Sequence, residues 1–182
     1  MDKTLIHRNR RYYLNRMRII LQAMEPLQGY VLDLGCGEML LKTFLDLSKV
    51  QYTGVDETGF SKEPYFIWSD AIKYLRTEVQ PCDFLFCLGV LDHLNKEQSS
   101  EMLRLIEISH AGCLIIQQAN SSNPFIRNQN KVPLHFNKYS MQQRIYLLKL
   151  PMMQSVWSVP DNKWSRWLAT ECVEIWRKHS LE

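Results

Sequence analysis

The strongest constraint on this chain is a repeated alternation between apolar, strand-like runs and helix-like segments. The apolar runs lie at residues 30–34, 51–55, 65–68, 84–90 and 113–118. Apolar residues at helical spacing separate them, at residues 38–47, from 70 to about 75, and from 95 to 108. Such alternation predicts a parallel sheet that helices cover on both faces, which is the doubly wound α/β architecture.

The last third of the sequence departs from this alternation. Residues 119–138 are polar, contain two prolines and predict a long loop. Ser140, with Gln143 at capping-box spacing, predicts a helix. Two further strand candidates, residues 153–159 and 167–176, are joined by turn-forming residues and predict a closing hairpin. The expected fold is therefore a mostly parallel seven-stranded sheet that ends in an antiparallel hairpin.

Length and composition limit the chain to one ordinary domain, which we expect to span residues 1–182. The five cysteines form no CxxC pair and no zinc-like spacing, so we expect reduced thiols, no metal site and a cytoplasmic protein. No apolar stretch approaches the roughly 20 residues that span a bilayer. Residues 181–182 resemble the scar of a purification tag.

The positive charge is concentrated at the N-terminus. Within residues 1–18, Asp2 is accompanied by six basic residues: Lys3, Arg8, Arg10, Arg11, Arg16 and Arg18. Tyr13, Met17 and Ile20 recur at helical spacing through the same stretch. We interpret it as an amphipathic helix whose arginines face solvent, in preference to a nucleic-acid-binding surface, which remains the alternative.

The stretch VLDLGCG, residues 31–37, places one acid in a buried strand just before a glycine-rich turn. Gly35 and Gly37 allow a sharp turn and close approach of a ligand, and ligands of doubly wound sheets bind beyond the carboxyl ends of the strands. Asp33 is then expected to face the ligand. Asp56 ends the second strand, so the two acids bracket one nucleoside-sized pocket.

The residues after this turn argue against a phosphate ligand. A dinucleotide fingerprint needs glycine or alanine at position 40, where this chain has Leu40, and no GK[ST] of a Walker loop follows. A carboxylate at the turn instead favours a ligand with a positive end. Cys36 between the glycines we interpret as a small turn residue, because no histidine lies near it in sequence to act as its base.

These residues resemble the motifs of the class I S-adenosylmethionine-dependent methyltransferases along most of the chain. The turn resembles the family's first motif, which holds the methionine end of the cofactor, and Asp56 corresponds to the acid that binds both ribose hydroxyls. The resemblance implies S-adenosylmethionine as cofactor. The residues expected to bind it are Asp33, Gly35, Cys36, Gly37, Asp56, Asp70, Ala71, Leu88, Gly89 and Tyr13.

Two further motifs and one departure complete the resemblance. Asp70 and Ala71 resemble the motif that contacts adenine, and Leu88 and Gly89 resemble the strand-four motif beside the methionine moiety. Met39 stands where the family frequently has a third glycine. Each acid and glycine also has a simpler interpretation, as a helix cap or as part of an ordinary tight turn.

The resemblance implies methyl transfer to an N, O, S or C atom. The residues expected to act in catalysis are His93, Asp92 and His135. Residues 1–28 and 119–138 are expected to form a lid and an active-site loop. No [ND]PP[YF] motif follows the fourth strand, which argues against the amino groups of adenine, cytosine and glutamine as acceptors. Because the chain is short and shows no inserted cap domain, we expect a small-molecule acceptor. We also expect a monomer or homodimer. The alternatives are RNA, a protein acceptor, or cofactor binding without catalysis.

Overall fold

A single eight-stranded sheet forms the centre of the computed structural model, which describes residues 3–58, 63–78, 80–120, 123, 134–150, 155–162 and 168–179. The strands are β1 (Gly29–Leu34), β2 (Val50–Asp56), β3 (Phe66–Trp68), β4 (Phe84–Leu88), β5 (Cys113–Ala119), β6 (Tyr139–Leu150), β7 (Ser155–Val159) and β8 (Glu171–Lys178). The helices are α1 (Lys3–Gln22), α2 (Ala71–Thr77) and α3 (Lys96–Ile108), with short 3₁₀ helices η1 (Leu41–Phe44) and η2 (Leu91–His93).

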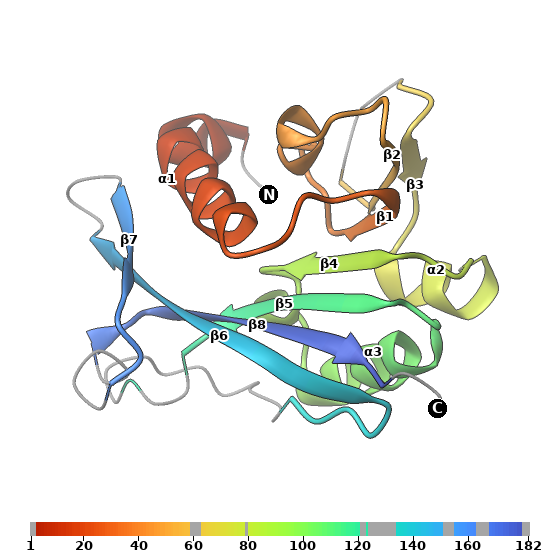
Figure 1. Cartoon of the computed structure of the whole chain (residues 1–182). Helices are drawn as coiled ribbons and strands as arrows, with labels where there is room; N and C mark the ends of the chain where they lie inside the picture. The colour runs from red at the N-terminus through yellow and green to blue at the C-terminus, as the bar shows by residue number, and fades with distance from the viewer. Residues whose placement is uncertain are drawn as a thin grey trace.

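The strand order is β3-β2-β1-β4-β5-β8-β6-β7 (Figure 1). The first five strands pair in parallel, and β8, β6 and β7 each pair antiparallel to the preceding strand in that order. Strand order reverses between β1 and β4, which is where a doubly wound sheet binds its ligand. The predicted α/β class with an antiparallel end is confirmed.

The sheet has one strand more than predicted because residues 139–150 form β6, and the helix predicted from Ser140 is wrong. Ile145 and Leu147 are buried in the core on the α1 face. Tyr146, between them, is buried in a separate small cluster. Alternation between two buried faces is the two-residue period of a strand, and this burial outweighs the local capping-box signal.

The closing hairpin also has different members from those predicted. β6 pairs with β7, while β8 lies between β5 and β6 and pairs with both. Of the predicted strands, residues 153–154 and 167 lie outside the described part of the chain. Turn-forming residues between two strands predict that the chain reverses there, but they do not determine whether the two flanking strands pair with each other.

The helix predicted at residues 38–47 is reduced to one 3₁₀ turn, η1. Met39 has a φ of +53°, which a right-handed helix cannot contain, and Leu45 is extended. The caps of the other two helices are confirmed. The side chain of Asp70 accepts from the Lys73 N–H, and Asn95 and Gln98 form the predicted capping box.

The sheet separates two hydrophobic cores, and helices cover both faces (Figure 1). One core packs α2 and α3 against the sheet, with Met102 and Ile106 of α3 fully buried. The other packs α1 against the opposite face through Tyr12, Met17 and Ile20. The predicted N-terminal helix therefore covers the face of the sheet opposite α2 and α3.

Candidate functional site

The turn after β1 and the end of β2 are tied together at the carboxyl edge of the sheet. The Gly37 N–H donates to Asp56 Oδ2 at 2.9 Å, and the Gly35 N–H donates to the Val55 carbonyl at 2.7 Å. The other carboxylate oxygen of Asp56 accepts from the backbone and hydroxyl of Thr58, both at 2.6 Å. The structure thus brings together the glycine turn and the second acid, as the sequence predicts.

The turn has the left-handed backbone that its glycines allow. Gly35 has a φ of +69° and Gly37 a φ of +52°. A Cβ on Gly35 would lie 2.3 Å from Val90 Cγ2, whereas a Cβ on Gly37 would meet no atom within 4 Å. Gly37 therefore borders open space. Met39, in place of the third glycine, keeps the left-handed φ of +53° with its side chain buried.

Asp70 and Ala71 lie next to Asp56 across the β2 and β3 ends. The Ser69 N–H donates to the Asp56 carbonyl at 3.3 Å, and Asp70 follows at the N-terminus of α2. The N-cap interpretation of Asp70 is confirmed, since its Oδ1 accepts from Lys73. Both residues are half-buried at the same edge of the sheet as the glycine turn.

Asp33 is almost fully buried on the face that α1 covers. Its Oδ2 accepts a 2.8 Å hydrogen bond from the Tyr52 hydroxyl. Burial raises the pKa of Asp33 to about 7, although the Tyr52 hydrogen bond and the positive charge of Arg16 oppose that rise. The Asp33 side chain therefore lies buried beneath the turn, bonded to Tyr52.

This pKa shift predicts a pH dependence of stability. Asp33 binds its proton more tightly in the folded state, with a pKa of about 7 against 3.8, so its contribution to stability is complete at low pH and is lost as pH rises from about 4 to 7. We expect the difference in unfolding free energy between wild type and Asp33→Asn to fall by a few kcal/mol over that interval, at about 1.4 kcal/mol per pKa unit. Urea unfolding at several pH values measures it, and a constant difference would contradict the assignment.

Cys36 is built into the turn as a neutral thiol. Burial raises its pKa well above the ordinary value, and the negative charges of Asp33 and Asp56 raise it further. All five cysteines of the chain are free and buried. A raised pKa disfavours the thiolate form of Cys36, in agreement with its sequence interpretation as a small turn residue.

Leu88 ends β4, and Gly89 follows it at the carboxyl edge of the sheet, next to Arg16, which the sequence predicts to face solvent. Gly89 has a φ of +81°, and a Cβ there would lie 3.8 Å from Arg16 Nη1. Arg16 is only 7% exposed, so the prediction that it faces solvent is wrong. Arg11 and Arg18 are exposed as predicted, and the side chains of residues 8 and 10 lie outside the described part.

Arg16 is held from three directions. Its Nη1 donates to Gln117 Oε1 at 2.8 Å, and its guanidinium lies 4.9 Å from the ring centre of the half-buried Tyr13. Glu171, the first residue of β8, lies 3.9 Å from Nη1. The sequence carried no signal for Arg16, Gln117 and Glu171, because their proximity depends on α1 crossing the ends of β5 and β8.

The three residues predicted for catalysis do not gather at one place. Asp92 and His93 follow β4 in η2 at the carboxyl edge, where Asp92 accepts from the Ala119 N–H at 3.1 Å and His93 is exposed. His135 lies at the opposite edge, because β6 begins four residues later beside the amino end of β5. Its Nε2 contacts Asn137 Oδ1 at 3.2 Å. The structure therefore does not bring His135 to this site.

The predicted active-site loop, residues 119–138, is described only in part. Asn120 and Asn123 donate to the Ala169 carbonyl at 2.8 Å and 3.0 Å, which fixes the start of the loop beside β8. Residues 121–122 and 124–133 lie outside the described residues, as do residues 181–182.

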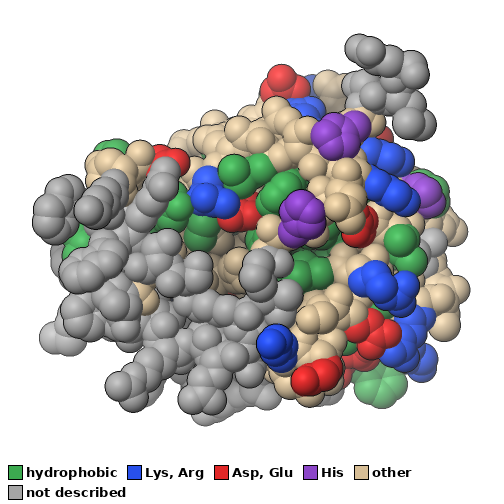
Figure 2. Space-filling model, turned by 90° about the horizontal axis from the view of Figure 1, so that it is seen from below, with side chains coloured by type: hydrophobic (Ala, Val, Ile, Leu, Met, Phe, Trp, Pro, Cys, Tyr) green, Lys and Arg blue, Asp and Glu red, His purple; other side chains and the backbone are tan. Residues whose placement is uncertain are grey.

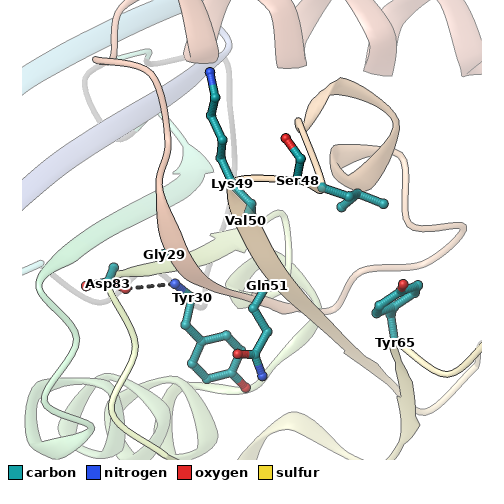
Figure 3. A pocket seen from close by; sticks show the side chains of 9 residues that line it. Gly29, Tyr30, Ser48, Lys49, Val50, Gln51, Tyr65 and Asp83 are labelled. Carbon is teal, nitrogen blue, oxygen red and sulfur yellow. Dashed lines mark hydrogen bonds between the residues drawn. The ribbon is translucent and has the colours of Figure 1, made fainter.

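A separate pocket lies at the amino ends of β1 and β2, on the edge opposite the glycine turn. Figure 3 shows Tyr30, Gln51 and Asp83 around it, with the Asp83 carboxylate accepting from the Tyr30 N–H at 2.7 Å. It contains none of the residues predicted to bind the cofactor. Within the described ranges, no cluster of three potential metal ligands occurs, and no helix is long and apolar enough to cross a membrane.

Charged side chains of both signs are mixed on the face turned toward the viewer in Figure 2. Among the side chains coloured there, the basic groups do not join into one continuous surface of the kind that binds nucleic acid.

Comparison with solved structures identifies the fold. A S-adenosylmethionine-dependent methyltransferase from Archaeoglobus fulgidus superposes with a TM-score of 0.65 at 17% identity, covering 97% of this chain and 100% of that one. Magnesium protoporphyrin IX methyltransferase from Synechocystis, solved with S-adenosylmethionine bound, gives a TM-score of 0.58 at 17% identity, covering 95% and 82%. No protein-family model and no curated protein matches the sequence. The chain has the fold of the class I S-adenosylmethionine-dependent methyltransferases.

Proposed function

We propose that this protein is a methyltransferase that binds S-adenosylmethionine at the turn after β1 and transfers its methyl group to a small molecule. The observation that carries the proposal is the hydrogen bond from the Gly37 amide to Asp56. It holds the acid at the end of β2 beside a glycine turn that borders open space. A carboxylate in that position suits a ribose diol and disfavours a phosphate.

The residues present fit each part of such a cofactor. Asp56 would accept from the ribose hydroxyls, and Asp70 with the Ala71 amide would face adenine. Asp33, buried and poised to ionise, would lie near the positive methionine end. Arg16 carries a buried Nε without a hydrogen-bond partner, which suits the methionine carboxylate. These four contacts run along one edge of the sheet, from β3 to α1.

When bound, the cofactor supplies a methyl group on a positively charged sulfur that a nucleophile attacks in line. The protein shields that group from water and aligns it with the nucleophile. Correct alignment of two reactants lowers the activation barrier by about 7–11 kcal/mol. Tyr12 and Met17 of α1, both buried against the sheet, exclude water from the inner side of the site. We assign α1 the part of a lid on this basis.

One comparison supports the small-molecule acceptor. The structurally similar Synechocystis enzyme is named for a porphyrin acceptor, which is a small molecule. Asp92 and His93 lie at the carboxyl edge, close to Gly89 in sequence. Of the three residues predicted for catalysis, we keep these two as candidates for contact with the acceptor. Cofactor binding without turnover on any acceptor would favour a non-catalytic role.

The direct test is a thermal-shift comparison. We expect S-adenosylhomocysteine to raise the melting temperature of the protein, because a ligand at 100 times its Kd stabilises the folded state by about 2.7 kcal/mol. NAD and ATP should not do so, since Asp33 and Asp56 oppose their phosphates. Stabilisation by NAD alone would contradict the proposal and favour a dinucleotide site.

A further inference from the structure

Five polar side chains gather where α1 crosses the carboxyl end of β5, the start of β8 and the end of β6. Tyr12 donates its hydroxyl proton to Glu171 Oε1, and Lys149 Nζ lies 4.3 Å from the Tyr12 ring centre. Arg16 donates to Gln117 and lies 3.9 Å from Glu171 Oε2. We call these residues the Glu171 cluster.

Two atoms of the Glu171 cluster are buried without a hydrogen-bond partner. They are Arg16 Nε and Glu171 Oε2. In the described part of the chain, only Ser99 of α3 has another such side-chain atom, and it lies in the other core layer. The side chains of Arg16 and Glu171 are 9% and 14% exposed, so bulk water does not replace the missing partners. A buried charged group left short of a partner is costly, and a ligand that completes it explains why it persists.

The Glu171 cluster adjoins the proposed cofactor site on the side away from the ribose. A Cβ on Gly89 would lie 3.4 Å from Gln117 Oε1 and 3.8 Å from Arg16 Nη1, so the end of β4 borders the cluster. Glu171 pairs with Ala119 at the carboxyl end of β5, two strands from β1 and three from β2. A cofactor with its ribose at Asp56 and its methionine end at Gly89 would therefore reach the Glu171 cluster.

We propose that the methyl acceptor is an amine and that Glu171 Oε2 binds its N–H and takes its proton. This inference rests on the proposed function. A carboxylate oxygen accepts charge-assisted hydrogen bonds from N–H groups. Tyr12 donates to the other oxygen of Glu171, whereas Oε2 lies 3.9 Å from Arg16 Nη1 and accepts no hydrogen bond, so Oε2 can accept one from a ligand. A buried base of this kind is useful only for a nucleophile that carries a proton.

The proposed step balances without another reactant. The acceptor nitrogen gives its proton to Glu171 Oε2 and its lone pair to the methyl carbon. A C–N bond forms as the C–S bond breaks, and that electron pair stays on sulfur, which becomes the neutral thioether of S-adenosylhomocysteine. Glu171 then returns the proton to water.

Sinefungin tests this arrangement without knowledge of the acceptor, because it carries an ammonium group where the cofactor carries its methyl. Calorimetric titration compares its affinity with that of S-adenosylhomocysteine. We expect the wild type to bind sinefungin at least about tenfold more tightly, as charge-assisted hydrogen bonds allow. The ratio of the affinity for sinefungin to the affinity for S-adenosylhomocysteine should fall to about one in Glu171→Gln, whose affinity for S-adenosylhomocysteine itself should not change. Glu171→Asp should restore part of the preference for sinefungin.

Glu174→Gln is the matched control. Glu174 is a second buried glutamate of β8, but it pairs with Arg144 and Trp176 away from the Glu171 cluster, so its loss should lower stability and leave the ratio unchanged. A wild-type ratio near one, or a ratio that survives in Glu171→Gln, would overturn the amine proposal while the methyltransferase proposal stands. If wild type binds neither ligand, the proposed function fails and this inference fails with it.

Discussion

Asp56→Ala is expected to weaken S-adenosylhomocysteine binding at least about 100-fold. Two hydrogen bonds from ribose hydroxyls to a carboxylate would be lost, each worth roughly 1.5–3 kcal/mol. The carboxylate also holds the Gly37 amide at 2.9 Å, so the substitution loosens the turn that faces the ligand. Calorimetric titration of wild type and variant measures the effect.

Two neighbouring variants separate binding from folding. Asp56→Asn keeps an oxygen for the Gly37 amide but loses the charge, so its affinity should fall between those of wild type and Asp56→Ala. Glu57→Ala removes the exposed acid that follows in sequence and should bind like wild type. Unchanged affinity in a folded Asp56→Ala protein would place the ribose elsewhere.

Arg16→Met is expected to lower the affinity for S-adenosylhomocysteine at least about tenfold, the effect of one lost charge-assisted hydrogen bond. The affinity for methylthioadenosine should change little, because that compound keeps the nucleoside and thioether but lacks the carboxylate that Arg16 would bind. Calorimetry with both ligands separates the amino-acid end of the cofactor from the rest.

Stability must be measured beside affinity in this variant. Removing Arg16 leaves Glu171 without its nearby positive charge, and breaking a buried pair costs about 3–5 kcal/mol. Arg18→Met, an exposed position on the same helix, is the control and should affect neither property. An equal loss of affinity for both ligands would show that Arg16 acts on the fold and not on the carboxylate.

The parts of the fold that the sequence predicts well are those whose signals are local. The continuously apolar runs became β1 to β5 within two residues at each end, and the Asn95 capping box begins α3 as predicted. The pairing of Asp56 with Gly37 follows from parallel strands whose carboxyl ends meet at one edge. These inferences need only the period of the pattern and the direction of the strands.

The remaining features depend on contacts between distant segments. Arg16 has the same local context as the exposed Arg18, and only the crossing of α1 over β5 and β8 buries it. Insertion of β8 between β5 and β6 directs the chain before β6 to the amino edge, which separates His135 from the site. Met39 adopts the left-handed conformation of a glycine because the turn and its buried side chain require it.

A crystal structure of the protein with S-adenosylhomocysteine tests the central claim most directly. We predict that the ribose hydroxyls contact Asp56, that the chain lies against Gly35 and Gly37, and that the carboxylate reaches Arg16. A nucleoside bound at the pocket beside Tyr30 and Asp83, at the opposite edge of the sheet, would contradict the account.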